Sequence, residues 1–245
     1  MASTSEATIG NNVTNLGLLI TNYTNMGVAY NPGKVAYKLP ALNTLKTNAD
    51  LAHKNVGDKK QAYRLKVAER AAGYNPLKKL TTRCLNIFLA SDALDQVKDG
   101  AKALADKVRG KDTSTPPPPP VPGQTPEENQ HSTIQQSFSM IGENFGLFIE
   151  MLRAEPTYLP GKDDIKLVAL DALLATLLTK NDAVDVAFVV YKTALADRDK
   201  IFFDVTSGLV DVALATKKYI LGDFGSGSPE YNAIKGISFT RKKKP

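Results

Sequence analysis

The sequence predicts an all-α protein made of two tandem, duplicated up-and-down helical bundles, with three to four helices in each, joined by a proline-rich linker. Three observations support this prediction. Ala, Leu, Lys and Asp dominate the body of the chain, a composition that favours helices over sheets. Apolar residues recur at spacings of three and four, which is the helical period. Related motifs also stand on both sides of one proline run.

The proline run sets the expected domain boundaries. Five consecutive prolines, Pro116–Pro120, cannot form a helix because proline lacks the backbone N–H and restricts its predecessor. We therefore expect a first bundle at residues 1–112, a linker at 113–127 and a second bundle at 128–245. The linker has the composition of a semi-rigid polyproline II spacer, and a PxxP ligand for an SH3-like partner is the alternative.

The repeated motifs keep a nearly constant offset of 126 to 129 residues, with small slips where loops are expected. This pattern is typical of a tandem duplication. Three motifs carry it: Asn15–Ile20 recurs as Asn144–Ile149, Tyr30–Lys34 as Tyr158–Lys162, and Val108–Gly110 as Ile234–Gly236.

Each copy is expected to contain the same helices in the same order. They cover residues 12–28, 34–73, 76–91 and 92–109 in the first copy, and 133–153, 162–203, 204–221 and 230–235 in the second. The Pro-Gly turns at Pro32 and Pro160 end the first helix of each copy. Ile237 and Phe239 alternate with polar residues, which predicts a short extended piece near the C-terminus.

The long helix of the second copy has apolar residues at 167, 170, 174, 177, 184, 188, 191 and 195, forming one stripe. Asn181 interrupts this stripe, and His53 is its counterpart in the first copy. Both positions fit a polar residue in the middle of a continuous helical seam, or a bend. We favour the continuous helix and expect Val184–Tyr191 to belong to its buried seam.

Few residues suit catalysis or metal binding. His53 and His131 are the two histidines, and Glu128-x-x-His131 lacks the second such pair that a di-iron bundle needs. Nucleophile-elbow, phosphate-loop and cysteine-cluster zinc motifs are absent from the sequence. Cys84 stands in an apolar run and is expected to be a buried, inert thiol. We therefore expect no enzyme activity and no cofactor or metal.

Charge is distributed unevenly along the chain. Residues 1–122 carry a net charge of +8 and residues 123–245 a net charge of −2, within a total of +6. Two basic groups are candidate contacts for an anion or a partner, and solvated surface charge is the competing interpretation of both. The first group is a basic face formed by Lys59, Lys60, Arg64, Lys66 and Arg70, and the second is the C-terminal tip formed by Arg241, Lys242, Lys243 and Lys244.

The beginning of the chain lacks the features of a secretory signal, and the longest apolar runs are too short to span a membrane. A cytoplasmic location is therefore expected, with leaderless export as the alternative.

Taken together, the paired Asn-x-Gly-x-x-Ile openings, the Tyr-x-Pro-Gly turns and the ending from Ser228 to Thr240 resemble a group of uncharacterised bacterial proteins of the Bacteroidota. The resemblance spans most of the chain, and it implies no activity.

The expected function is that of a non-enzymatic structural or assembly protein, which binds further copies of itself or a protein partner through helical surfaces. A basic nucleic-acid-associated protein is the first alternative. A helical membrane-active protein, similar to pore formers, is the second.

Overall fold

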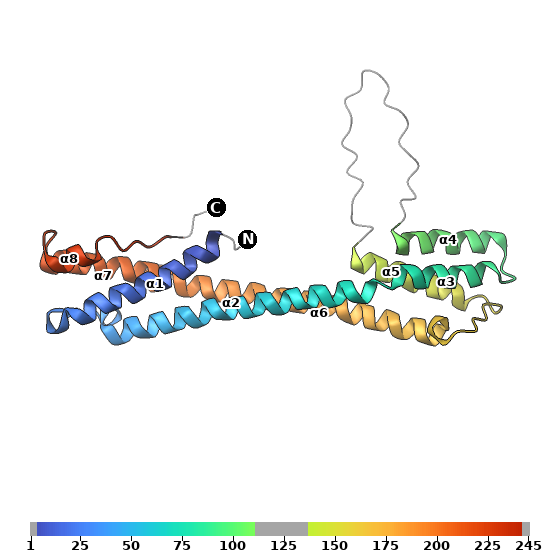
Figure 1. Cartoon of the computed structure of the whole chain (residues 1–245), viewed down its shortest axis with the longest axis horizontal. Helices are drawn as coiled ribbons and strands as arrows, with labels where there is room; N and C mark the ends of the chain where they lie inside the picture. The colour runs from blue at the N-terminus through green and yellow to red at the C-terminus, as the bar shows by residue number, and fades with distance from the viewer. Residues whose placement is uncertain (1–3, 111–136, 242–245) are drawn as a thin grey trace, which may run out of the picture. The chain divides into compact units, whose positions relative to one another are not determined.

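The computed structural model describes residues 4–110 and 137–241, and this part of the chain is all-α, without a β-strand. Figure 1 shows the order of the helices. The first half of the chain forms α1 (Thr4–Asn25), α2 (Leu39–Tyr74), α3 (Leu77–Leu89) and α4 (Asp95–Arg109). The second half forms α5 (Phe138–Arg153), α6 (Leu167–Phe203), α7 (Leu209–Phe224) and α8 (Pro229–Ile234). The expected linker at 113–127 lies outside the described residues.

Both long helices are continuous. α2 runs through His53 and α6 runs through Asn181 without a break, so the bend considered for these two positions does not occur. Asn181 is buried as the seam predicts, and its Nδ2 donates to the hydroxyl of Tyr74 at 2.9 Å. A short 3₁₀ helix precedes each long helix, Val35–Tyr37 before α2 and Asp163–Ile165 before α6.

Local sequence explains several of the helix ends. Ser137 and Ser228 cap α5 and α8 by accepting backbone N–H groups of Met140 and Tyr231. Gly110 ends α4 in the left-handed conformation at φ 66°, which glycine adopts without steric cost.

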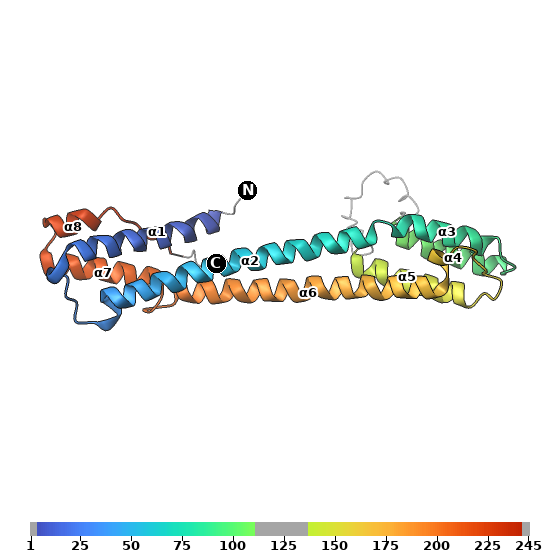
Figure 2. The same cartoon turned by 60° about the horizontal axis from the view of Figure 1, so that its bottom comes forward.

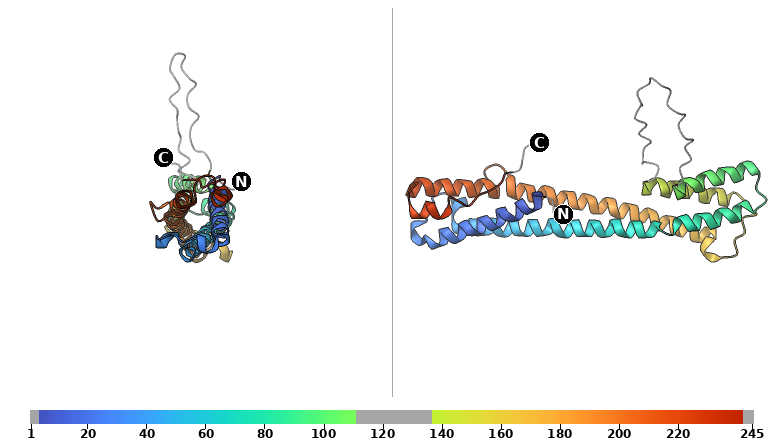
Figure 3. Two further views of the ribbon diagram at one scale, coloured as in Figure 1. Left: turned by 90° about the vertical axis from the view of Figure 1, so that its left-hand side faces the viewer. Right: turned by 45° about the horizontal axis from the view of Figure 1, so that its top comes forward.

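The chain forms two compact units, and each contains helices from both halves of the sequence. Unit 1 comprises residues 1–63 and 187–245, whereas unit 2 comprises residues 64–186. In unit 1, α1 lies beside α7 and α8, as Figure 2 shows. In unit 2, α4 packs against both α3 and α5, and Figure 3 shows the three helices at one end of the picture.

This division differs from the expected bundles at 1–112 and 128–245. The core of unit 2 joins Leu85 and Phe88 of α3 to Phe145 and Phe148 of α5. The core of unit 1 joins α1 to α7 and α8 in the same way. The physical reason is that α4 packs against α5, and α1 against α7 and α8, so helices from both halves complete each core. The halves therefore do not close separately around their own cores.

Candidate functional site

The C-terminal segment of unit 1, residues 236–241, lies outside any helix and is held by side chains of α1 and α7. Asn12 on α1 makes a reciprocal pair with Thr240: its Nδ2 donates to the Thr240 carbonyl and its Oδ1 accepts the Thr240 N–H, both at 3.0 Å. One turn later, Nδ2 of Asn15 donates to the carbonyl of Ser238 at 2.7 Å. Two asparagines at i and i+3 on one helix face thus hold alternate residues of the segment.

Helix α7 supplies the other side of this arrangement. The ammonium group of Lys217 donates to the carbonyls of Lys235 at 3.1 Å and Ile237 at 2.5 Å, and burial lowers the pKa of this group. The Asp211 carboxylate pairs with the Arg241 guanidinium at 2.8 Å. We call Asn12, Asn15, Asp211 and Lys217 the tail clamp.

Apolar contacts complete the binding of the segment. The side chains of Ile237 and Phe239 are partly buried and pack against the core of unit 1. The predicted alternation of these two residues is therefore used for packing, although the segment joins no sheet. The tail clamp binds backbone carbonyls, one backbone N–H and one arginine, which is the chemistry of polypeptide recognition.

The tail clamp was not predicted from the sequence, although one signal for it was present. Asn12 occupies a position in the apolar stripe of α1 that includes Ile9, Val13 and Leu16, and its side chain is buried. A polar residue in such a stripe must find a hydrogen-bond partner, because an unpaired buried amide is costly. Nothing in the sequence indicated that the partner is Thr240.

Helix α6 of unit 1 exposes three consecutive large apolar side chains. The exposed fractions of Phe188, Val189 and Val190 are 42%, 61% and 42%. Tyr63 of α2 lies against Phe188 on one side, with ring centroids 5.5 Å apart, and the Lys192 ammonium lies 5.3 Å from the same ring. We call Phe188–Val190 the α6 apolar patch.

The α6 apolar patch corrects the expectation that Val184–Tyr191 forms a buried seam. Val184 is buried, but the three patch residues are exposed. Consecutive residues on a helix are separated by about 100°, so three adjacent apolar residues cannot all face one neighbouring helix.

In unit 2, a groove between α3 and α4 is lined mainly by cations. It has a volume of about 460 Å³ and is lined by Lys78, Lys79, Thr82, Arg83 and Arg109. Arg109 donates to the Thr82 hydroxyl at 3.2 Å and pairs with Asp106. Among the described residues, no carboxylate lies within ion-pair distance of Lys78 or Lys79, although both stand in the first turn of α3. Cations at a helix N-terminus oppose the helix dipole, so stability of α3 does not explain this placement.

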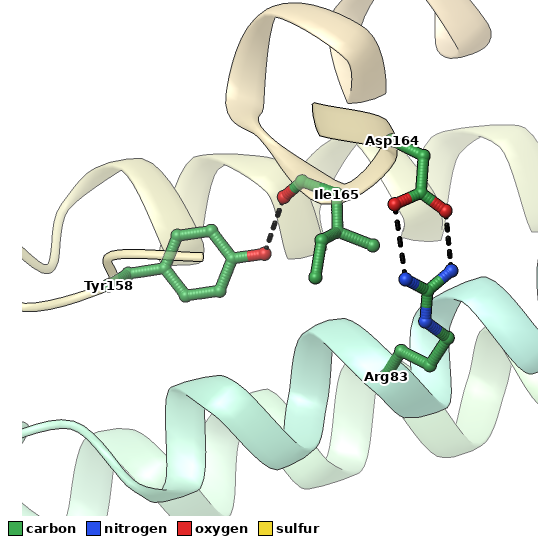
Figure 4. A network of polar contacts seen from close by, with 4 residues as sticks. All are labelled: Arg83, Tyr158, Asp164 and Ile165. Carbon is green, nitrogen blue, oxygen red and sulfur yellow. Dashed lines mark hydrogen bonds and ion pairs between the residues drawn. The ribbon is translucent and has the colours of Figure 1, made fainter. Parts of the chain in front are cut away.

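The corner before α6 fixes Arg83 of this groove, as Figure 4 shows. The guanidinium of Arg83 binds both carboxylate oxygens of Asp164, at 2.5 and 3.1 Å, which lowers the pKa of the carboxyl. Beside it, the Tyr158 hydroxyl donates to the Ile165 carbonyl at 2.8 Å. Burial raises the pKa of Tyr158, and it also raises the pKa of the fully buried Cys84. Cys84 is therefore buried as predicted, in surroundings that disfavour its thiolate.

The predicted basic face does not form one uniform surface. Lys59 and Lys60 belong to unit 1, whereas Arg64, Lys66 and Arg70 belong to unit 2. The Lys66 ammonium pairs with Glu69 at 2.8 Å, and the guanidinium carbon of Arg70 lies 4.5 Å from the centre of the Phe138 ring.

Of the predicted C-terminal tip, Arg241 is described and pairs with Asp211 of its own chain. Lys242, Lys243 and Lys244 lie outside the described residues, as does His131. The charge difference expected between the two halves of the sequence is found between the two units instead. By sequence count, unit 1 carries a net charge of +7 and unit 2 a net charge of −1.

Within residues 4–110 and 137–241, no three His, Cys, Asp or Glu side chains gather in a group that could hold a metal ion. In the same ranges, no helix combines the length and apolar character needed to cross a membrane. Comparison of the chain with protein-family models, curated proteins and solved structures finds no match. The resemblance to a bacterial family therefore stays a prediction from its motifs.

Proposed function

We propose that the chain is a non-enzymatic assembly protein that associates with further copies of itself through the α6 apolar patch. The observation that carries this proposal is the exposure of Phe188, Val189 and Val190 within one turn of α6, where two successive side chains, about 100° apart, can contact the same partner. Single exposed apolar residues are normal on protein surfaces, whereas contiguous ones are typical of interaction sites.

The energetics favour contact between identical patches. Complete burial of a Val or Phe side chain contributes about 1.5–3 kcal/mol, and each residue that a two-fold symmetric interface covers is buried twice, once in each copy. Valine is also a weaker helix former than Ala, Leu or Lys. The exposed valines Val189 and Val190 therefore do not stabilise α6 as an isolated helix.

Light scattering coupled to size-exclusion chromatography tests the proposal over a range of protein concentrations. We expect the wild-type chain to exceed the monomer mass, and Val189→Lys to have a lower mass than the wild type at each concentration. Val168→Lys is the matched control, because Val168 stands on the same helix and is 82% exposed outside the patch. A wild-type chain that stays monomeric at every concentration, or equal effects of the two substitutions, would refute the proposal.

The cationic groove of unit 2 favours a second candidate function, the binding of a nucleic acid. Its support is that Lys78 and Lys79 lack carboxylate partners among the described residues and share the groove with Arg83 and Arg109. Phosphate contacts of this kind weaken steeply as salt rises. We expect low-salt mobility shifts of RNA or DNA that Lys78→Gln/Lys79→Gln removes, while the control Lys98→Gln/Lys102→Gln on α4 retains them. Unshifted nucleic acid at low salt would dismiss this candidate.

Tandem duplication of the chain is also proposed, and two pairs of equivalent contacts support it. Tyr30 donates to the carbonyl seven residues later, at Tyr37, as Tyr158 does to Ile165. A Cβ on Gly17 would meet Lys46, and a Cβ on Gly146 would meet Leu174, so the glycine of each repeated motif permits close packing on the following long helix. The cytoplasmic location stays a proposal as well, which cell fractionation tests.

A further inference from the structure

We infer that the tail clamp is a binding site for an extended polypeptide, and that its ligand in the assembled protein is the C-terminal segment of a second copy. In the structure, the chain's own residues 237–241 occupy this site. The inference concerns a different surface from the α6 apolar patch, and it does not depend on that patch.

The first argument is that the contacts of the segment do not require covalent continuity. Asn12 and Asn15 bind backbone groups of Thr240 and Ser238, and Lys217 binds the carbonyl of Ile237. An identical segment from another copy would present the same groups in the same order. Exchange of an identical element between copies keeps every such contact, which makes it a low-cost route to assembly.

The site also contacts both the backbone and the side chains of the segment. The asparagine and lysine contacts fix the path of the backbone, while Ile237 and Phe239 pack against the core of unit 1. The Asp211 carboxylate pairs with Arg241, two residues after Phe239, and because the Arg241 side chain is 66% exposed this pair adds only a weak preference for arginine. The preferred ligand is therefore an apolar-x-apolar-x-Arg segment, which the chain carries at residues 237–241, where Thr240 contributes only its backbone groups.

The third argument is the presence of a pivot directly before the segment. Gly236 follows Lys235, the C-cap of α8, and glycine restricts backbone rotation less than any other residue, so the chain can change direction here. Release of the segment breaks the backbone hydrogen bond from Ile237 to Ile234, while Ile234 itself stays buried in the core. Because residues 237–241 are themselves bound, only Lys235 and Gly236 can bridge two copies, so the exchange requires the two sites to lie within about 7 Å of each other's α8 ends.

Two full-length variants separate the tail from its site. The tail variant, Ile237→Asp/Phe239→Asp, carries a tail that cannot pack and leaves the site vacant. The site variant, Asn12→Ala/Asn15→Ala, carries a normal tail that its own site holds poorly. Both also contain Val189→Lys, so that association through the α6 apolar patch does not contribute and the two proposals can fail separately.

We expect each variant alone to have the monomer mass, and an equimolar mixture to form a 1:1 complex of twice that mass in light scattering. In the control mixture, the tail variant is combined with Asn22→Ala, which also carries Val189→Lys. Asn22 donates only to Leu18 of its own helix, so this control keeps its tail in its own site and no complex is expected. Monomer mass in both mixtures would overturn the exchange.

A labelled peptide of residues 236–245 gives a second, independent measurement by fluorescence anisotropy. It should bind the tail variant, and the Asn12→Ala/Asn15→Ala substitutions added to that variant should weaken binding about tenfold or more, because three hydrogen bonds are lost. If the tail variant is poorly folded, the peptide should restore its helical circular dichroism. Equal binding of a scrambled peptide, or no binding and no restored helicity, would overturn the inference.

Discussion

Cutting the chain within the expected linker, between Gly123 and Gln124, distinguishes the two possible domain organisations. If each half formed its own bundle, the cut would release two independently folded pieces. In the structure, the core of unit 2 contains nine buried residues from the first half and eight from the second. We therefore predict that the two fragments stay associated after cleavage and unfold together.

The size of the effect follows from the eight residues of the second half in this core: Phe145, Phe148, Ile149, Leu152, Tyr158, Ile165, Leu170 and Leu177. Exposure of a large apolar side chain costs about 1.5–3 kcal/mol, so their complete exposure would cost about 12–24 kcal/mol as an upper bound. Most of this range lies above the free energy of unfolding of an ordinary domain, which is about 5–15 kcal/mol. The second fragment alone should therefore not keep this packing.

The assay uses a protease site inserted at that position, with the uncut chain as its control. After cleavage, the fragments should co-elute from a sizing column, keep their helical circular dichroism and unfold in one cooperative urea transition. Each fragment expressed alone should have a much smaller helical signal. Separation of the fragments without denaturant, each with its own cooperative transition, would refute the assignment of the cores.

Three further predictions concern single contacts. Phe148→Ala should lower the free energy of unfolding by about 3–5 kcal/mol because Phe148 is fully buried, whereas the control Leu147→Ala, 56% exposed, should change it far less in urea titrations. Tyr74→Phe should lower the free energy of unfolding by about 1–3 kcal/mol, because it leaves the buried Asn181 amide without its acceptor. The addition of Asn181→Leu should recover part of this loss. An unchanged urea midpoint in Tyr74→Phe would contradict the hydrogen bond. Burial raises the pKa of Tyr23 to about 12 from about 10 in the unfolded chain. The contribution of Tyr23 to the free energy of unfolding should therefore be complete below pH 10 and be lost as the pH rises toward 12. In urea titrations at alkaline pH, Tyr23→Phe should make the stability depend less on pH.

The helices themselves could be predicted from the sequence because apolar residues recur with the helical period in the middle of the long segments. The stripe through Leu170, Leu177 and Val184 is buried as expected, and it runs through Asn181 without a break. The ends of the helices could be predicted less accurately. α1 begins at Thr4, eight residues before the expected start, because its first turns contain few apolar residues that would reveal the period.

The pairing of the helices could not be predicted in the same way. A stripe indicates which face of a helix is buried, but it does not identify the helix that covers it. In a chain with repeated motifs, the corresponding stripes of the two halves have similar spacing, so α1 could pack with α3 or with α7. Only the complete set of side-chain shapes decides between these partners, and it places Tyr23 of α1 against Thr216 of α7, with their oxygens 3.1 Å apart.

The tail clamp depends on this pairing and was therefore out of reach of sequence patterns. Asn12 and Lys217 are far apart in the chain, and they approach the same segment because α1 lies beside α7. Had each half formed its own bundle, α1 would have packed with helices of the first half, and Asn12 could not have reached Thr240. The fragment experiment thus also tests the clamp: if the two halves fold separately, residues 237–241 lose the α1 side of their binding site.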